Sequence, residues 1–155
     1  MRVCEGPDAP AVASRILAQQ GLSSVSKPVL RVAVALVHRG GSWLVARRHD
    51  DAHLGGLWEF PGGKRLTDES AESAALRELI EECGVDAQAE RVLDSVIHED
   101  EQRHVTITPV ICQWQAGAAR PIASLECRWV TLAEMRRLEM PPANGEIIRQ
   151  LKQMT

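Results

Sequence analysis

The sequence lacks any apolar stretch long enough to span a membrane. Its first residues also lack the apolar run of a signal peptide, and they carry acidic side chains early, at Glu5 and Asp8. We therefore expect a chain with neither a membrane segment nor an export signal, and we predict a cytoplasmic protein.

Cysteine is sparse and unpaired along the chain. The four cysteines, Cys4, Cys83, Cys112 and Cys127, are scattered, and no two of them form a C-x-x-C pair. This spacing argues against a disulfide framework and against a zinc site, and it indicates reduced thiols.

An excess of positive charge is missing too. The formal net charge is −3, so no overall basic field would draw the chain to a nucleic-acid polymer. The length of 155 residues suits one domain with a real core, and 45% hydrophobic with 25% charged residues is an ordinary globular composition. The sequence contains no internal repeat or low-complexity tract, and no feature specifies an oligomeric state.

What the chain does contain is a cluster of acidic residues on one predicted helix. Residues 70–83 have helical periodicity, with Ser70 able to cap the start and Gly84 suited to a left-handed stop. The apolar positions of this helix are Ala71, Ala75, Leu79 and Cys83 at four-residue steps, with Leu76 and Ile80 beside them.

The acidic residues of this helix call for a positive partner. Glu78, Glu81 and Glu82 border the apolar stripe, and like charges at such spacings repel one another. Glu82 lies at the edge of the stripe, where partial desolvation would oppose its ionisation. A divalent cation would remove both difficulties, and all-oxygen ligands favour magnesium, manganese or calcium over zinc. The competing interpretation is a solvated acidic helix face.

The spacing of these residues resembles the Nudix box. All nine of its defined positions are filled within 23 residues: Gly63, Glu69, Arg77, Glu78, Leu79, Glu81, Glu82, Gly84 and Val85. The flanking segments W-E-F-P-G-G-K at 58–64 and M-P-P-A-N at 140–144 resemble the MutT branch of this superfamily. The resemblance extends over residues 29–153.

This resemblance implies a fold, an activity and a cofactor. The fold would be α/β (α+β), with a mixed β-sheet between helices, in a domain at 29–155 that follows an N-terminal extension at 1–28. The activity would be hydrolysis of a nucleoside triphosphate, 8-oxo-dGTP or a related nucleotide, to the monophosphate and pyrophosphate. The cofactor would be Mg²⁺, with Mn²⁺ able to substitute.

The resemblance also assigns catalytic roles. It gives the metal to the backbone carbonyl of Gly62 and to four carboxylates: Glu78, Glu81, Glu82 and Glu126. Glu126 is chosen by position alone, as an acid before a late strand. Glu78 is the candidate general base. Arg77 is expected to pair with a glutamate of the box and fix its rotamer.

Five residues are predicted to bind the substrate: Arg48, Phe60, Lys64, Arg103 and Asn144. The side-chain amide of Asn144 offers a donor and an acceptor, which suits a purine edge, and an acceptor facing N7 would favour the oxidised base. Asn144 could instead be a helix N-cap, because it follows Pro141 and Pro142. Arg48 and Lys64 could be ordinary surface charges, and Phe60 could be core.

Three functions compete at this point. The first is hydrolysis of oxidised purine triphosphates. The second is hydrolysis of another nucleotide, such as CTP or a modified dCTP, because similar W-E-F-x-G-G-K segments occur in that branch. The third is a non-catalytic MutT-like recognition module, which the intact glutamates of the box argue against.

The expected elements surround the box. Strands are expected at 29–38, 43–46, 92–98, 104–114 and 126–131, and helices at 9–20, 70–83, from a cap at Thr131 through Arg137, and at 144–154. A linker is expected at 22–28. Pro109 should bend or bulge its strand, or place it at a sheet edge.

Overall fold

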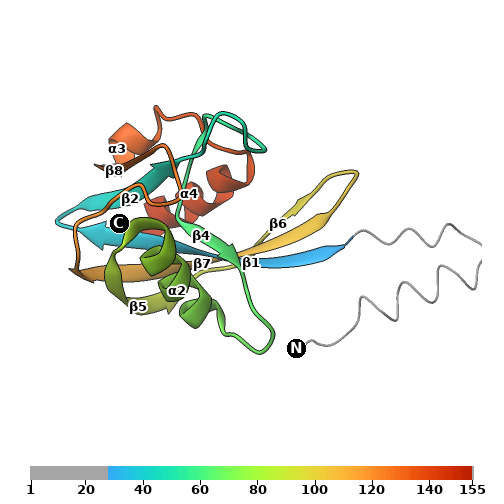
Figure 1. Cartoon of the computed structure of the whole chain (residues 1–155), viewed down its shortest axis with the longest axis horizontal. Coiled ribbons are helices and arrows are strands. Elements are labelled where there is room, and N and C mark those ends of the chain that lie inside the picture. The colour runs from blue at the N-terminus through green and yellow to red at the C-terminus, as the bar shows by residue number, and fades with distance from the viewer. Residues whose placement is uncertain (1–27, 155) are drawn as a thin grey trace, which may run out of the picture.

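The computed structural model describes residues 28–154, so the predicted helix at 9–20 and nearly all of the N-terminal extension lie outside the described residues. The strands are β1 (Val29–Arg39), β2 (Ser42–Arg47), β3 (Trp58–Glu59), β4 (Gly62–Lys64), β5 (Asp86–Val92), β6 (Val96–Glu99), β7 (His104–Ala116) and β8 (Glu126–Val130). The helices are α2 (Ala71–Cys83), α3 (Leu132–Met135) and α4 (Ala143–Met154) (Figure 1).

A mixed sheet forms the centre of the molecule. Its main order is β3-β2-β1-β7-β5, while β4 pairs with β1, β6 with β7 and β8 with β2. Only the β1–β7 pair is parallel among these described strands, and it extends from Val29 opposite His104 to His38 opposite Gln113. The long apolar β1 therefore lies in the interior of the sheet.

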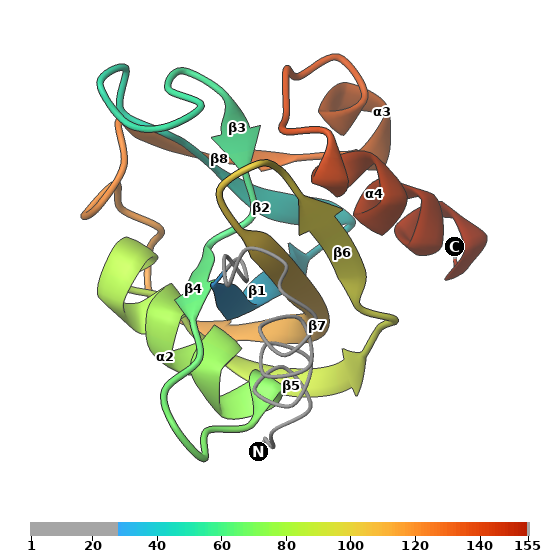
Figure 2. The same cartoon turned by 90° about the vertical axis from the view of Figure 1, so that its right-hand side faces the viewer.

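Helices cover both faces of the sheet, which confirms the predicted fold class. Figure 2 shows α2 on one side and α3 with α4 on the other. Consecutive residues of β1 point to opposite faces: Ala35 and Val37 pack in the core beneath α2, whereas Leu36 packs in the core beneath α4. Two separate apolar cores therefore hold the helices to the sheet.

The ends of α2 confirm the caps predicted from sequence. The hydroxyl oxygen of Ser70 accepts a hydrogen bond of 3.1 Å from the Ser73 amide, and Gly84 has a φ of 69°, in the left-handed region. Leu79 and Cys83 are fully buried, as the apolar stripe predicts, but Ile80 is 53% exposed. Ile80 was therefore wrongly expected beside the core.

The strand expected at 92–98 is wrong, because the structure has two strands there. β5 ends at Val92 and β6 begins at Val96, and both pair with β7. Pro109 lies in β7 opposite the break, where its carbonyl accepts a hydrogen bond of 2.9 Å from the Leu93 amide. Proline cannot donate to this side of the ladder. The neighbouring strand is thus interrupted opposite Pro109, and β7 is an interior strand rather than the edge strand that the proline suggested.

The C-terminal helices differ slightly from expectation. Thr131 caps α3 in a capping box with Glu134, as predicted, but α3 ends at Met135 rather than Arg137. α4 begins at Ala143, so Asn144 is a residue of the helix and not its N-cap. None of the helices among residues 28–154 has the length and apolar character needed to cross a bilayer.

Candidate active site

Arg77 contacts three carboxylates at once. Its Nε and Nη2 donate to the two carboxylate oxygens of Glu69 at 2.8 and 3.0 Å. Its Nη1 donates to Glu78 at 3.0 Å and to Glu81 at 3.2 Å. The planar guanidinium suits this fork geometry, and hydrogen bonding to Arg77 holds the pKa of Glu69 below its usual range. Arg77 therefore offsets the repulsion within the cluster and fixes the position of Glu78.

Glu82 lies on the inner side of the cluster. Its Oε1 accepts a hydrogen bond of 3.3 Å from the Gly62 amide. Burial, and then the nearby negative charge of Glu78, raise the pKa of Glu82 to about 8. This confirms the expectation from the helical wheel that the environment of Glu82 opposes ionisation unless a positive charge is present.

The donors here fit a divalent cation. Glu78 and Glu82 are two crowded carboxylates, whose oxygens suit Mg²⁺ or Mn²⁺, and the backbone of Gly62 adjoins Glu82 through its amide. Glu81 is more exposed, and its carboxylate faces Arg77. Among residues 28–154, no group of three or more His, Cys, Asp or Glu side chains is arranged to hold a metal. The fit therefore rests on Glu78, Glu82 and the adjoining backbone.

Two glycines allow this close packing. A β-carbon on Gly63 would lie 2.6 Å from the carboxylate carbon of Glu78, and one on Gly62 would collide with the backbone of Ala33 and Val34 in β1. Any other residue at either position would force these groups apart. The glycines of the W-E-F-P-G-G-K segment thus let β4 lie directly against both β1 and Glu78.

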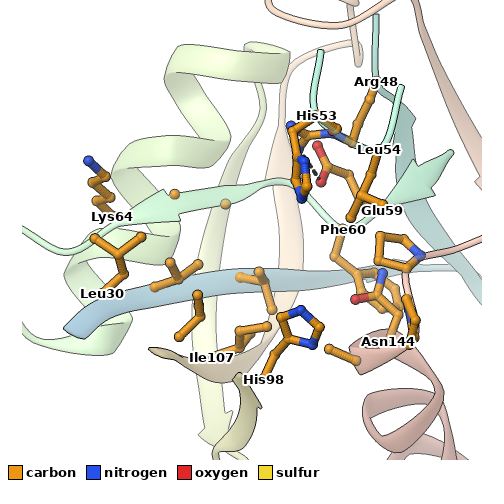
Figure 3. Close-up of a pocket in the computed structure, with 18 of the residues that line it drawn as sticks. Leu30, Arg48, His53, Leu54, Glu59, Phe60, Lys64, His98, Ile107 and Asn144 are labelled. Atoms are coloured by element: carbon orange, nitrogen blue, oxygen red, sulfur yellow. Dashed lines mark hydrogen bonds and ion pairs between the residues drawn. The ribbon is translucent and has the colours of Figure 1, made fainter. Parts of the chain in front are cut away.

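A cavity of about 310 Å³ lies between β4 and the start of α4 (Figure 3). All five residues predicted to bind the substrate line this cavity: Arg48, Phe60, Lys64, Arg103 and Asn144. Gly62, Gly63 and Glu82 line it as well, so it adjoins the acidic cluster. The fold therefore brings together side chains from five separate stretches of the chain, although their roles in binding stay predictions.

Glu59 is a site residue that the sequence reasoning missed. It lines the cavity and accepts a hydrogen bond of 2.9 Å from Nη1 of Arg48. Burial raises the pKa of Glu59, and the adjacent Arg48 partly offsets this effect. Its place in the W-E-F segment was the available signal. Arg48 is also held by the His53 carbonyl, to which its Nε donates at 2.7 Å, so Arg48 is not a free surface charge.

Asn144 lines the cavity and carries a buried, unpaired amide nitrogen. The residue is 7% exposed, and its Nδ2 is buried with no hydrogen-bond partner among the described residues. Figure 3 shows Asn144 beside Phe60 and across from His98. Leaving a buried donor unpaired costs about 1–3 kcal/mol. A ligand acceptor in the cavity would remove that cost.

Two predicted residues lie in other environments. Phe60 is 2% exposed and belongs to the core beneath α4, and it also lines the cavity, while its contact with a substrate stays a prediction. Glu126 begins β8 and pairs with Arg128 at 2.9 Å. It does not line the cavity, and no described contact joins it to Glu78 or Glu82. Its role as a metal ligand stays a prediction.

The sequence of this chain is similar to those of known nucleotide hydrolases. A family model described as NUDIX domain matches residues 32–150. The 8-oxo-dGTP diphosphatase of Escherichia coli (strain K12) is 30% identical over 126 residues, which cover 81% of this chain and 98% of that protein. The CTP pyrophosphohydrolase of the same organism is 44% identical over 59 residues, which cover 38% of this chain and 44% of that protein.

Solved structures agree in fold. The crystal structure of a MutT protein from Methanosarcina mazei Go1 matches with a TM-score of 0.75 and 23% identity, over 84% of this chain and 97% of that one. At this identity the likeness concerns the fold alone.

Proposed function

The chain belongs to the Nudix family as a MutT-like hydrolase of phosphoric anhydride bonds, and from this premise we propose that it hydrolyses 8-oxo-dGTP or a closely related purine nucleotide to the monophosphate and pyrophosphate, with Mg²⁺. The observation that supports a nucleotide base in this cavity is the buried, unpaired Nδ2 of Asn144, and the choice of a purine rests on the similarity to an 8-oxo-dGTP diphosphatase. A nucleotide with its base at Asn144 would have its phosphates toward the acidic cluster.

The base would be recognised by the amide of Asn144. Its Nδ2 can donate to a carbonyl on the purine edge, at C6 or at the oxidised C8, which satisfies the buried donor. Its Oδ1 can accept from the N7 proton that only the 8-oxo form carries. Phe60 supplies an apolar wall next to this position. Asn144 would therefore prefer the oxidised base over the unmodified one.

The phosphates would be bound on the opposite side. Lys64 and Arg103 line the cavity with cationic groups. Arg103 lies 4.0 Å from the Asp100 carboxylate, whereas Arg48 is held more tightly, by Glu59 at 2.9 Å and by the His53 carbonyl at 2.7 Å. The Arg48–Glu59 pair offers both a donor and an acceptor, which suits the sugar or the base better than a phosphate. We therefore assign phosphate binding to Lys64 and Arg103.

The acidic cluster would carry the chemistry. Glu78, Glu82 and the Gly62 carbonyl would hold Mg²⁺, with Glu81 at the outer side, and the chemistry that Mg²⁺ supplies when bound is neutralisation of the phosphate oxygens. Glu78 would take the proton of the attacking water as general base. Arg77 would keep the Glu78 carboxylate in place through its bond of 3.0 Å.

A second candidate function is hydrolysis of CTP or a modified dCTP. The local identity to a CTP pyrophosphohydrolase favours it, because the matched 59 residues are more similar than those of the 8-oxo-dGTP diphosphatase. That match covers under half of either chain. The amide of Asn144 could also pair with a cytosine edge.

A substrate panel with product analysis tests these functions. The full chain would be assayed with Mg²⁺ on 8-oxo-dGTP, dGTP and CTP, and pyrophosphate distinguished from orthophosphate. We expect the highest kcat/KM for 8-oxo-dGTP, with pyrophosphate as product. A higher kcat/KM for CTP would favour the second function. Absence of turnover, with Mg²⁺ bound, would favour a recognition module.

A further inference from the structure

Two thiols that are far apart in sequence meet at the end of α2. Cys83 is the last residue of the helix and is fully buried, while Cys127 lies in β8 and is partly exposed. Their Sγ atoms are 3.7 Å apart and share a hydrogen bond. The scattered cysteines in the sequence gave no sign of this pair, because only the packing of α2 against β8 creates it.

We propose that Cys83 and Cys127 form an oxidation site, at which a peroxide converts the two thiols into a disulfide. A disulfide requires the sulfurs to approach to about 2.05 Å. The contact of 3.7 Å leaves a movement that rotation of the two side chains can supply. Cys112, the third described cysteine, is buried and hydrogen-bonds to the Val110 carbonyl instead.

The environment distinguishes the two sulfurs. Cys127 has the exposed path to solvent, and Ser124 Oγ lies 3.8 Å from its Sγ. Cys83 is fully buried and has no such path. Cys127 is therefore the attacking sulfur and Cys83 the resolving one.

The reaction balances with a peroxide as the oxidant. The Cys127 thiolate attacks one oxygen of hydrogen peroxide, the O–O bond breaks, and hydroxide leaves with a sulfenic acid on Cys127. The Cys83 sulfur then attacks the sulfur of Cys127, and the S–O bond breaks. The displaced oxygen leaves as water with the thiol proton. In total, two thiols lose two electrons and two protons, and one peroxide becomes two waters.

The bridge would cross-link a point next to the acidic cluster. Glu82 precedes Cys83, and its carbonyl accepts hydrogen bonds from the amides of Ile122 and Ala123. The Cys83 carbonyl accepts one of 2.9 Å from Arg120. The 117–125 segment thus already contacts the end of α2. Oxidation would join this end of α2 covalently to β8, so that a disulfide would link the residues on the two sides of the segment.

The test is a thiol assay on the whole chain, in a Cys4→Ser background that removes the cysteine outside the described residues. The reduced protein would be treated with hydrogen peroxide, alkylated and digested without reductant. We expect a peptide pair linked through Cys83 and Cys127, lighter by two hydrogen atoms than the reduced pair and separated by dithiothreitol. Cys112 should stay reduced.

Matched variants separate the mechanism from bystander oxidation. Cys112→Ser should leave the link unchanged, whereas Cys127→Ser should abolish it. Cys83→Ser, if folded by circular dichroism, should leave a Cys127 sulfenic acid that dimedone traps. If Cys83→Ser does not fold, comparison of Cys112→Ser with Cys127→Ser still tests whether the disulfide requires Cys127 and not Cys112. Oxidation of Cys127 to the sulfinic acid without a link to Cys83, or a link through Cys112, would overturn the proposal. None of these readouts depends on nucleotide hydrolysis.

Discussion

The carboxylate of Glu78 occupies the space that a β-carbon on Gly63 would need, at 2.6 Å from the carboxylate carbon. Two parts of the box that stand far apart in sequence are thus in direct contact. Position 63 must be glycine for Glu78 to take this position, because the Glu78 carboxylate can lie against β4 only where no side chain projects.

Gly63→Ala should therefore displace the Glu78 carboxylate while leaving the fold intact, because the group in the way is the end of a flexible side chain. We expect kcat to fall by about 10²-fold, the scale of a misplaced reacting group, with little change in Tm. Gly145→Ala is the matched control, since a β-carbon there meets no atom within 4 Å. Wild-type kcat in Gly63→Ala would contradict the stated contact.

Glu78→Gln should remove the general base but keep the shape of the side chain and a carbonyl oxygen for Arg77. A loss of about 10²–10⁴ in kcat is the usual cost of losing such a base. Glu81→Gln is the comparison, because Glu81 is exposed and should matter less. Single-turnover kinetics and far-UV circular dichroism on both variants check this. If Glu78→Gln keeps its activity, the assignment of the base is wrong.

Asn144→Leu should separate binding from stability. Leucine is close in size and removes a buried donor that has no partner in the described structure, so Tm should stay the same or rise. The kcat/KM for 8-oxo-dGTP should fall by about 10- to 100-fold, which corresponds to the loss of one buried hydrogen bond. Gln153→Leu, at an exposed position of the same helix, is the control. A large loss of Tm in Asn144→Leu would show a structural role instead.

The pH dependence of stability should report on Glu82. Its pKa is about 8 in the metal-free folded chain and near the ordinary glutamate value when unfolded, so the folded state binds the proton more tightly. The protonated Glu82 carboxyl contributes fully to stability below the pKa that Glu82 has in the unfolded chain. This contribution is lost as the pH rises through the pKa of Glu82 in the folded chain. Urea unfolding between pH 5 and pH 9, with chelator present, should therefore show stability falling toward alkaline pH.

The control for this prediction is Glu82→Gln, which has no proton to lose and should flatten the decline. Added Mg²⁺ should stabilise the wild-type protein most at alkaline pH, where the carboxylate is ionised. A wild-type profile that rises from pH 6 to pH 9 in chelator would contradict the raised pKa.

Local patterns in the sequence predicted α2 well. Its apolar period, the Ser70 cap and the Gly84 stop are all set within one stretch of chain, so the position of Glu82 near the core followed from helical geometry alone. The exposure of Ile80 did not follow, because it depends on which neighbouring segments cover the helix.

Features that depend on distant partners were not predictable in the same way. The break between β5 and β6 is set by Pro109 on another strand, and the pairing of Glu59 with Arg48 requires β2 and β3 to lie side by side. Glu126 pairs with Arg128, which its sequence position did not indicate. Burial and pairing across the sheet decided each of these outcomes.

The parallel pairing of β1 with β7 has a consequence for the order of synthesis. Val29 pairs with His104, so the whole box leaves the ribosome before the strand that completes this pair. β7 supplies Val105 and Ile107 to the cavity wall. A nascent chain that ends before His104 would contain every glutamate of the box and yet lack the cavity wall, so nucleotide binding must wait for translation of the second half of the domain.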